Sequence, residues 1–186
     1  MVSLASLWLP ILVSAVGVFI ASSIFWMALP HHKTDWRKLP NEDAFLNAVR
    51  SQGIGGGMYM FPGCAPADLK TPEAQERFKK GPWGSITLLG APPNMGKALP
   101  LWLLHLVIVS VLVAYVIGHA LGAGEPFKHV FRLASAMAWV AYAGGAMPGT
   151  IWEGKPSSFA AKAIVDGLVY ALITGAIFGW LWPHAA

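Results

Sequence analysis

The residue whose chemistry stands out in this sequence is Asp166, an acid inside a long apolar run. It lies about seven residues into the run from Phe159 to Trp182, which at 1.5 Å per residue is roughly 10 Å into a helix. An ionised carboxylate at that depth in a membrane is costly unless it has a partner. His105 lies at a similar depth in another apolar run, and Lys162 lies one helical turn before Asp166. We therefore predict a polar site at Asp166, with His105 as its partner across a helix interface and Lys162 as a local competitor.

The polar character of this helix face continues beyond Asp166. Tyr170 and Thr174 follow at spacings of four and eight residues, so they extend the same stripe. Two interpretations remain open. The stripe is either a path for a proton or a small substrate, or a set of structural hydrogen bonds around an acid that reaches the membrane surface.

A second pattern is the spacing of His105 and His119, which are fourteen residues apart, close to four turns of one helix. This spacing resembles that of the haem-carrying helices of b-type cytochromes, in which each histidine supplies an axial ligand. The resemblance implies partner ligands for haem b on other helices, and His31 or His32 near His105 and His129 near His119 are the candidates. Histidines at the membrane interface or in the core are the simpler account of the same spacing.

A third set of residues has the chemistry of a copper site. Imidazole, thioether and thiolate ligands favour Cu(I). We therefore expect His31, His32 and Cys64 as candidate metal ligands, although no spacing matches a defined copper motif and methionines beside aromatic residues also fill interfaces. The potential ligands all lie in the long loop between the first two apolar runs: His31, His32, Met58, Met60, Cys64 and Met95.

The composition indicates which elements position these residues. Of 186 residues, 55% are hydrophobic and only 12% are charged, too little charge for a soluble domain of this length. Four apolar runs are long enough to cross a bilayer. The sequence thus predicts an all-α membrane protein with one integral membrane domain over residues 1–186, a four-transmembrane-helix bundle with spans at about 4–29, 99–123, 130–152 and 159–182.

The long segment between the first two spans, residues 31–98, is rich in Gly and Pro and is expected to contain two short helices. Asn41 with two following acids caps the first, and Thr71 with Pro72 begins the second. The remaining stretches are too rich in Gly and Pro for regular structure and are expected to be extended segments and turns.

The Lys and Arg residues predict the orientation. Eleven of them lie in or beside the first and third loops, against two, Lys128 and Arg132, at the second. Because positively charged loops stay inside, we expect loop 31–98 in the cytoplasm and both termini outside, in a plasma (bacterial inner) membrane. The net charge is +4, and almost all charged residues lie between the apolar runs, which is typical of a membrane protein. Nucleic acid is therefore not an expected partner.

Small residues recur along three of the predicted spans and form a smooth face on each. Helices in lipid associate through faces of small residues, which allow the backbones to approach closely. We therefore expect the lipid bilayer and either other transmembrane subunits or a second copy of this chain as partners. The small residues are Ser14, Gly17 and Ala21 in the first span, Ala134, Ala138, Ala141 and Gly145 in the third, and Gly167, Ala171, Gly175 and Gly179 in the fourth.

The sequence contains no hydrolase or nucleotide-binding motif, which favours a protein that is not an enzyme. The expected function is a non-catalytic accessory or structural subunit of a larger membrane assembly. The two alternatives are a small oligomeric carrier or proton-coupled channel that uses Asp166 and His105, and a redox subunit that binds haem or copper.

Overall fold

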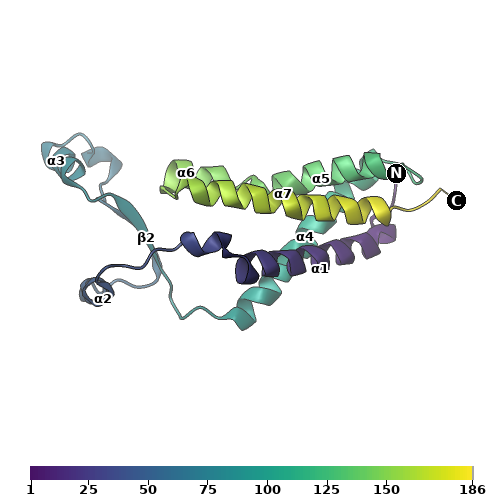
Figure 1. Cartoon of the computed structure of the whole chain (residues 1–186). Helices are drawn as coiled ribbons and strands as arrows, with labels where there is room; N and C mark the ends of the chain where they lie inside the picture. The colour runs from purple at the N-terminus through teal and green to yellow at the C-terminus, as the bar shows by residue number, and fades with distance from the viewer. Residues whose placement is uncertain (186) are drawn as a thin grey trace. The chain divides into compact units, whose positions relative to one another are not determined.

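The structure is a computed structural model that describes residues 1–185, and the chain divides into two compact units (Figure 1). The first, here called the helical unit, comprises Met1–Trp36, Met95–Ile151 and the chain from Lys155 onward. The second, here called the hairpin unit, comprises Arg37–Asn94 and Trp152–Gly154.

The helical unit begins with a continuous helical segment of 25 residues. A 3₁₀ turn, η1 (Leu4–Leu7), leads into α1 (Trp8–Ser23), which ends in a π-helical turn, η2 (Ile24–Ala28). Leu29 is extended, and the short 3₁₀ helix η3 (Pro30–Thr34) follows with proline at its first position. The helical segment ends here because the ring of a proline fixes φ and disfavours a helical conformation for the residue before it.

Three helical segments are long and apolar enough to cross a membrane. They are the N-terminal segment Leu4–Ala28, α4 (Met95–Ala120) and α7 (Ser157–Trp180). The described part of the protein is therefore mostly helical, with three candidate membrane spans.

The predicted third span differs from expectation because it is not one helix. Its residues form α5 (Phe127–Ala143) and α6 (Ala146–Glu153), of 17 and 8 residues. The break lies at Gly144 and the glycine that follows it. Glycine has low helix propensity, and Pro148 has no N–H to donate to the carbonyl of Gly144, so the helical ladder is interrupted at this point.

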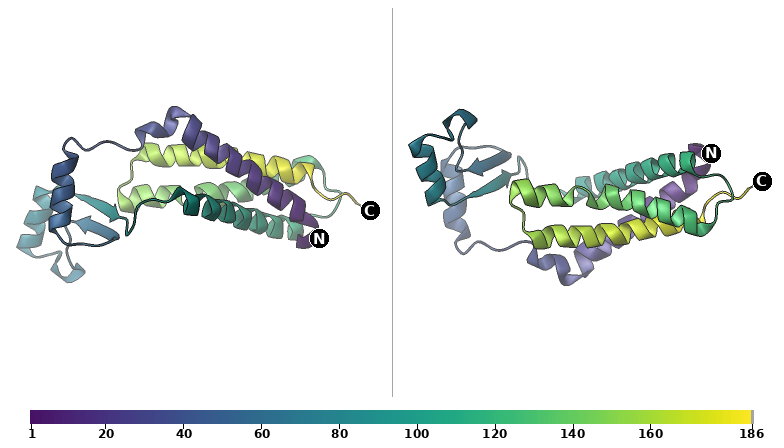
Figure 2. Two further views of the ribbon diagram at one scale, coloured as in Figure 1. Left: turned by 90° about the horizontal axis from the view of Figure 1, so that it is seen from below. Right: turned by 90° about the horizontal axis from the view of Figure 1, so that it is seen from above.

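The small-residue faces pack against each other inside the helical unit. Figure 2 shows α7 running alongside α5. A Cβ atom added at Gly175 of α7 would lie 2.8 Å from the carbonyl oxygen of Phe131 in α5, and one added at Gly17 of α1 would lie 3.1 Å from Cδ1 of Ile177 in α7. The largest group of buried apolar residues draws on α1, α4, α5 and α7 and on the segments that flank them: Leu7, Ile11, Val109, Val113, Ala114, Ile117, Val130, Ala134, Ala138, Ala171, Phe178 and Trp182.

Backbone hydrogen bonds join the start of the chain to the last turn of α4, and the loop after α4 to the segment that follows α7. The Val2 N–H donates to the Gly118 carbonyl at 2.8 Å, and the Gly124 N–H donates to the Pro183 carbonyl at 2.8 Å. The first residues of the chain and the last turn of α7 therefore lie at one end of the helical unit (Figure 2).

The hairpin unit contains two short helices with side-chain caps. The Asn41 side chain caps α2 (Glu42–Ser51) by accepting from the N–H three residues further on, at 3.1 Å. Thr71 caps α3 (Pro72–Lys80) in the same way, at 3.3 Å. These caps satisfy N–H groups that have no partner within the helix.

Two of the Gly- and Pro-rich stretches, expected to lack regular structure, pair as strands. β1 (Gly57–Phe61) and β2 (Gly84–Leu88) form an antiparallel two-stranded sheet in which Tyr59 pairs with Ile86. The Met-Tyr-Met-Phe and Ile-Thr-Leu sequences supply residues that favour strands, and the glycines lie at the strand ends.

Candidate functional site

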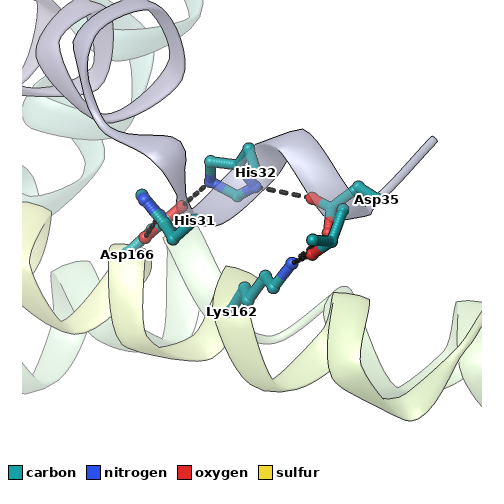
Figure 3. A network of polar contacts seen from close by, with 6 residues as sticks. His31, His32, Asp35, Lys162 and Asp166 are labelled. Atoms are coloured by element: carbon teal, nitrogen blue, oxygen red, sulfur yellow. Dashed lines mark hydrogen bonds and ion pairs between the residues drawn. The ribbon is translucent and has the colours of Figure 1, made fainter.

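The candidate site joins the segment after α1 to the first half of α7. His31 and His32 lie on η3, directly after the apolar segment ends, and Asp166 lies on α7. Their side chains point toward one another in Figure 3. Nε2 of His31 lies 3.1 Å from one carboxylate oxygen of Asp166, and Nε2 of His32 lies 2.7 Å from the other. Asp166 is thus held by two imidazole rings.

A second carboxylate completes the network on the far side of His32. Nδ1 of His32 lies 2.6 Å from Oδ2 of Asp35. The other oxygen of Asp35 accepts a hydrogen bond from Nζ of Lys162 at 2.5 Å, and the same ammonium donates to the Thr34 hydroxyl at 2.7 Å. The network therefore links η3 to two successive turns of α7 (Figure 3).

The acids of this network are withdrawn from solvent. The Asp35 side chain is 1% exposed and that of Asp166 is 5% exposed, whereas His31 is 31% exposed. Burial by itself raises the pKa of Asp35, but the hydrogen bonds from Lys162 and His32, together with the charges of both groups, hold that pKa below its ordinary value. Asp35 is consequently a carboxylate at neutral pH.

Aromatic rings fix the orientation of both imidazoles. The indole of Trp26 stacks on His32 with ring centres 3.9 Å apart and an angle of 8° between the planes. The rings of Phe25 and His31 make an edge-to-face contact, with ring centres 5.4 Å apart and an angle of 88° between the planes. Both aromatic residues lie on η2, so the π-helical turn supplies one wall of the site.

The structure gives Asp166 partners other than the predicted one. Among the described residues, the polar contacts of its carboxylate are with His31 and His32. His105 is exposed on α4 and its ring stacks on Trp102. The expected pair of Asp166 and His105 is therefore not formed. Lys162 was expected to compete for Asp166, and it binds Asp35 instead.

The other members of the predicted stripe are buried in the helical unit. The ring of Tyr170 meets those of Phe25 and Tyr142, each with centres 5.9 Å apart. The Thr174 hydroxyl donates to the Tyr170 carbonyl within α7 at 2.9 Å. Thr174 thus makes a structural hydrogen bond.

The two histidines expected to carry haem lie on an exposed side of α4. His119 is exposed like His105, and its Nδ1 lies 2.7 Å from the carbonyl oxygen of Tyr115. His129, the predicted partner of His119, lies with Nδ1 3.0 Å from a carboxylate oxygen of Glu125. The geometry therefore offers no pair of imidazoles facing each other across the bundle at these positions.

The predicted copper ligands divide between the two units. His31 and His32 come together in the helical unit, while Cys64 belongs to the hairpin unit, where its thiol lies 3.4 Å from the Ala65 carbonyl. Met58 and Met60 also belong to the hairpin unit. Met95, the remaining candidate, belongs to the helical unit. The polar partners that the structure gives His31 and His32 are oxygens of Asp166 and Asp35.

Sequence reasoning missed Asp35 and Trp26 as members of the site. A signal for Asp35 was present, because an acid three residues after His32 can meet its ring in a single helical turn. No comparable signal marks Trp26, because a tryptophan at the end of an apolar run is equally typical of an anchor at the membrane interface.

No family model matches this chain, and neither the curated proteins nor the solved structures searched contain a significant match.

Proposed function

We propose that this chain is a non-catalytic accessory subunit of a larger membrane assembly, and that its hairpin unit docks on a partner protein. The observation that carries the proposal is the absence of a core in that unit. Among its described residues, Ala74 is the single buried hydrophobic residue. A two-stranded sheet without a core is at best marginally stable alone, so a unit of this kind gains stability by covering its apolar side chains with another surface.

The hairpin unit exposes side chains that are typical of protein interfaces. Met58 and Met60 of β1 are 73% and 69% exposed, and Trp83 beside β2 is exposed too. Because side chains alternate along a strand, Met58 and Met60 lie on one face of the hairpin. Methionine and tryptophan are enriched at interface centres, and methionine adapts to irregular surfaces.

The charge of the hairpin unit favours a protein partner over the anionic surface of a membrane. The unit contains seven Lys and Arg residues against six Asp and Glu residues, a net charge of +1. Membrane surfaces attract clusters of basic residues, which a nearly balanced charge does not provide.

The proposal includes the topology in the membrane. In addition to the three candidate spans, we propose that α5 and α6 together make a fourth crossing. Loop 31–98 then lies in the cytoplasm with both termini outside, in a bacterial inner membrane. The support is the distribution of Lys and Arg, eleven at the first and third loops against two at the second.

Site-specific photocrosslinking of the full chain in its native membrane tests the docking surface. With p-benzoyl-phenylalanine in place of Met60, we expect one discrete adduct on irradiation. Placing the same probe at the exposed polar residue Gln52 is the matched control and should give no such adduct. Met58→Ser with Met60→Ser should also reduce the size of the detergent-solubilised complex.

Two results would contradict this proposal. One is a protein that sediments as a 19.9 kDa monomer with no adduct from Met60. The other is adducts of equal yield from both positions, which would indicate random collisions. An adduct of twice the mass of the chain identifies the partner as a second copy, and an adduct of another mass identifies a different subunit.

A further inference from the structure

We propose that His31, His32 and Asp166 bind a divalent first-row transition metal ion, for which Zn²⁺ is the probe. The ligand atoms of these residues lie within 4.8 Å of one another. They come from two segments about 135 residues apart in the chain and converge on one point. Two imidazoles and a carboxylate form a donor set that suits Zn²⁺, Fe²⁺ and related ions.

The hydrogen-bonding capacity of His32 is the strongest reason for a cation at this point. A carboxylate oxygen lies 2.6 Å from its Nδ1 and another lies 2.7 Å from its Nε2. A neutral imidazole has only one N–H, so one of the two contacts would place a lone pair of the ring against a carboxylate. A second proton on the ring, a proton on one of the carboxyl groups or a metal ion therefore lies between the ring and one of the two acids.

The partners of the two acids point the same way. Asp35 contacts the ammonium group of Lys162, whereas the contacts of the Asp166 carboxyl group among the described residues are the two imidazoles. A divalent ion between the imidazoles and Asp166 gives this buried carboxyl group a cationic partner.

The position of His31 favours a metal ion over a proton. A protonated His32 would satisfy both carboxylates without any second imidazole, yet Nε2 of His31 converges on the same carboxylate at 3.1 Å. Bond lengths of about 2.0 to 2.2 Å to a tetrahedral ion place two ligand atoms about 3.3 to 3.6 Å apart. The distance from Nε2 of His31 to Oδ1 of Asp166 is close to that range, whereas Nε2 of His32, 2.7 Å from the other oxygen, must move away from it by about 0.6 to 0.9 Å if that oxygen binds the ion.

The surroundings of the three ligands match those of metal sites. A histidine that binds a metal through one nitrogen commonly donates its other N–H to a carboxylate, and Asp35 is placed to accept from Nδ1 of His32. Lys162 in turn holds Asp35. His31 is the least buried of the three ligands, so an ion, and a water molecule as a further ligand, would reach the site from its side.

Metal binding by the full chain in detergent micelles tests the proposal. The protein carries a purification tag without histidine, is stripped with a chelator and is then titrated with Zn²⁺ and, for its absorption spectrum, with Co²⁺. We expect one ion per chain and a rise in thermal midpoint when Zn²⁺ is added. Asp166→Asn and His32→Gln should lose both effects. Asp35→Asn should keep one ion at saturation but bind it about 10- to 100-fold more weakly.

Matched controls separate this site from other histidines. His105→Gln with His119→Gln removes two exposed imidazoles of α4 and should leave the stoichiometry, the affinity and the Co²⁺ spectrum unchanged. If Asp166→Asn does not fold, His31→Gln, at the most exposed ligand, provides the same comparison. A wild-type protein that binds no stoichiometric ion, or ligand variants that bind as the wild type does, would overturn the proposal and leave hydrogen bonds as the account of the cluster.

Discussion

At the scale of single residues, the ion pair of Asp35 and Lys162 decides how η3 is attached to α7. The Asp35 carboxylate is buried, and its partners Lys162 and His32 come from the two elements that it joins. If a buried carboxylate loses its charged partner, no interaction offsets the free energy needed to remove the carboxylate from water. This pair is therefore a sensitive point for the stability of the helical unit.

We predict that Lys162→Met lowers the free energy of unfolding by about 2 kcal/mol, within the range for hydrogen bonds to charged groups. The value is moderate because the lysine side chain is 22% exposed and water screens part of the interaction. Thermal unfolding in detergent measures the change. Lys128→Met, at an exposed lysine of α5, is the control and should change stability by less than about 0.5 kcal/mol. Equal effects of the two substitutions would show that Asp35 does not depend on Lys162.

At the scale of elements, the packing of α5 against α7 depends on glycines that permit close approach. Gly167 faces Ala143, Gly175 faces Ser135 and Phe131, and Gly179 faces Phe127. Each of the three glycines lies on α7, at spacings of eight and four residues, so they form one face of that helix. Close backbone contact of this kind holds helices together in lipid, where apolar burial gives little driving force between them.

Gly175→Ala should destabilise this pair of helices by about 1 to 3 kcal/mol, the usual cost of overpacking. The new methyl group would clash with Oγ of Ser135, which can rotate, and would lie 2.8 Å from the Phe131 carbonyl oxygen, which cannot move without shifting α5. Gly145→Ala is the control, since no atom lies within 4 Å of its added Cβ, and it should be neutral or slightly stabilising. Thermal unfolding of both variants checks the difference, and a Gly175→Ala protein as stable as the Gly145→Ala protein would contradict the packing.

At the scale of the whole molecule, the question is whether the broken segment α5 and α6 crosses the membrane. If it does, the loop between α4 and α5 and the start of α7 lie on opposite sides. If it does not, they lie on the same side and the orientation of α7 is reversed. Helix α5 has 17 residues, the lower limit for a span, and its first two turns contain Lys128 and Arg132, so a crossing here requires α5 and α6 together.

Labelling of single cysteines with a membrane-impermeant maleimide distinguishes the two topologies. In a Cys64→Ser background, we expect Gln52→Cys and Ser158→Cys to be labelled from the cytoplasmic side only and Ala123→Cys from the outside only. Labelling of Ala123→Cys and Ser158→Cys from the same side would exclude the fourth crossing. Labelling of Gln52→Cys in intact cells would reverse the predicted orientation.

The sequence by itself determined the features that depend on local composition. Three apolar runs became helices long enough to span a membrane, because the backbone must satisfy its own hydrogen bonds in lipid. Asn41 and Thr71 cap helices because their side chains reach the nearby backbone N–H groups. The need of Asp166 for a partner also followed from its type and depth.

Only the tertiary structure decided which partner Asp166 has and which helix faces turn inward. His31 and His32 lie 135 and 134 residues before Asp166, and nothing in the local sequence relates them to α7. A helix that is apolar all round gives no contrast between a lipid-facing and a buried side, so the exposure of His105 on α4 could not be inferred from its spacing. The glycines of α7 show the same limit: the sequence predicted a smooth face, and the packing assigned it to α5.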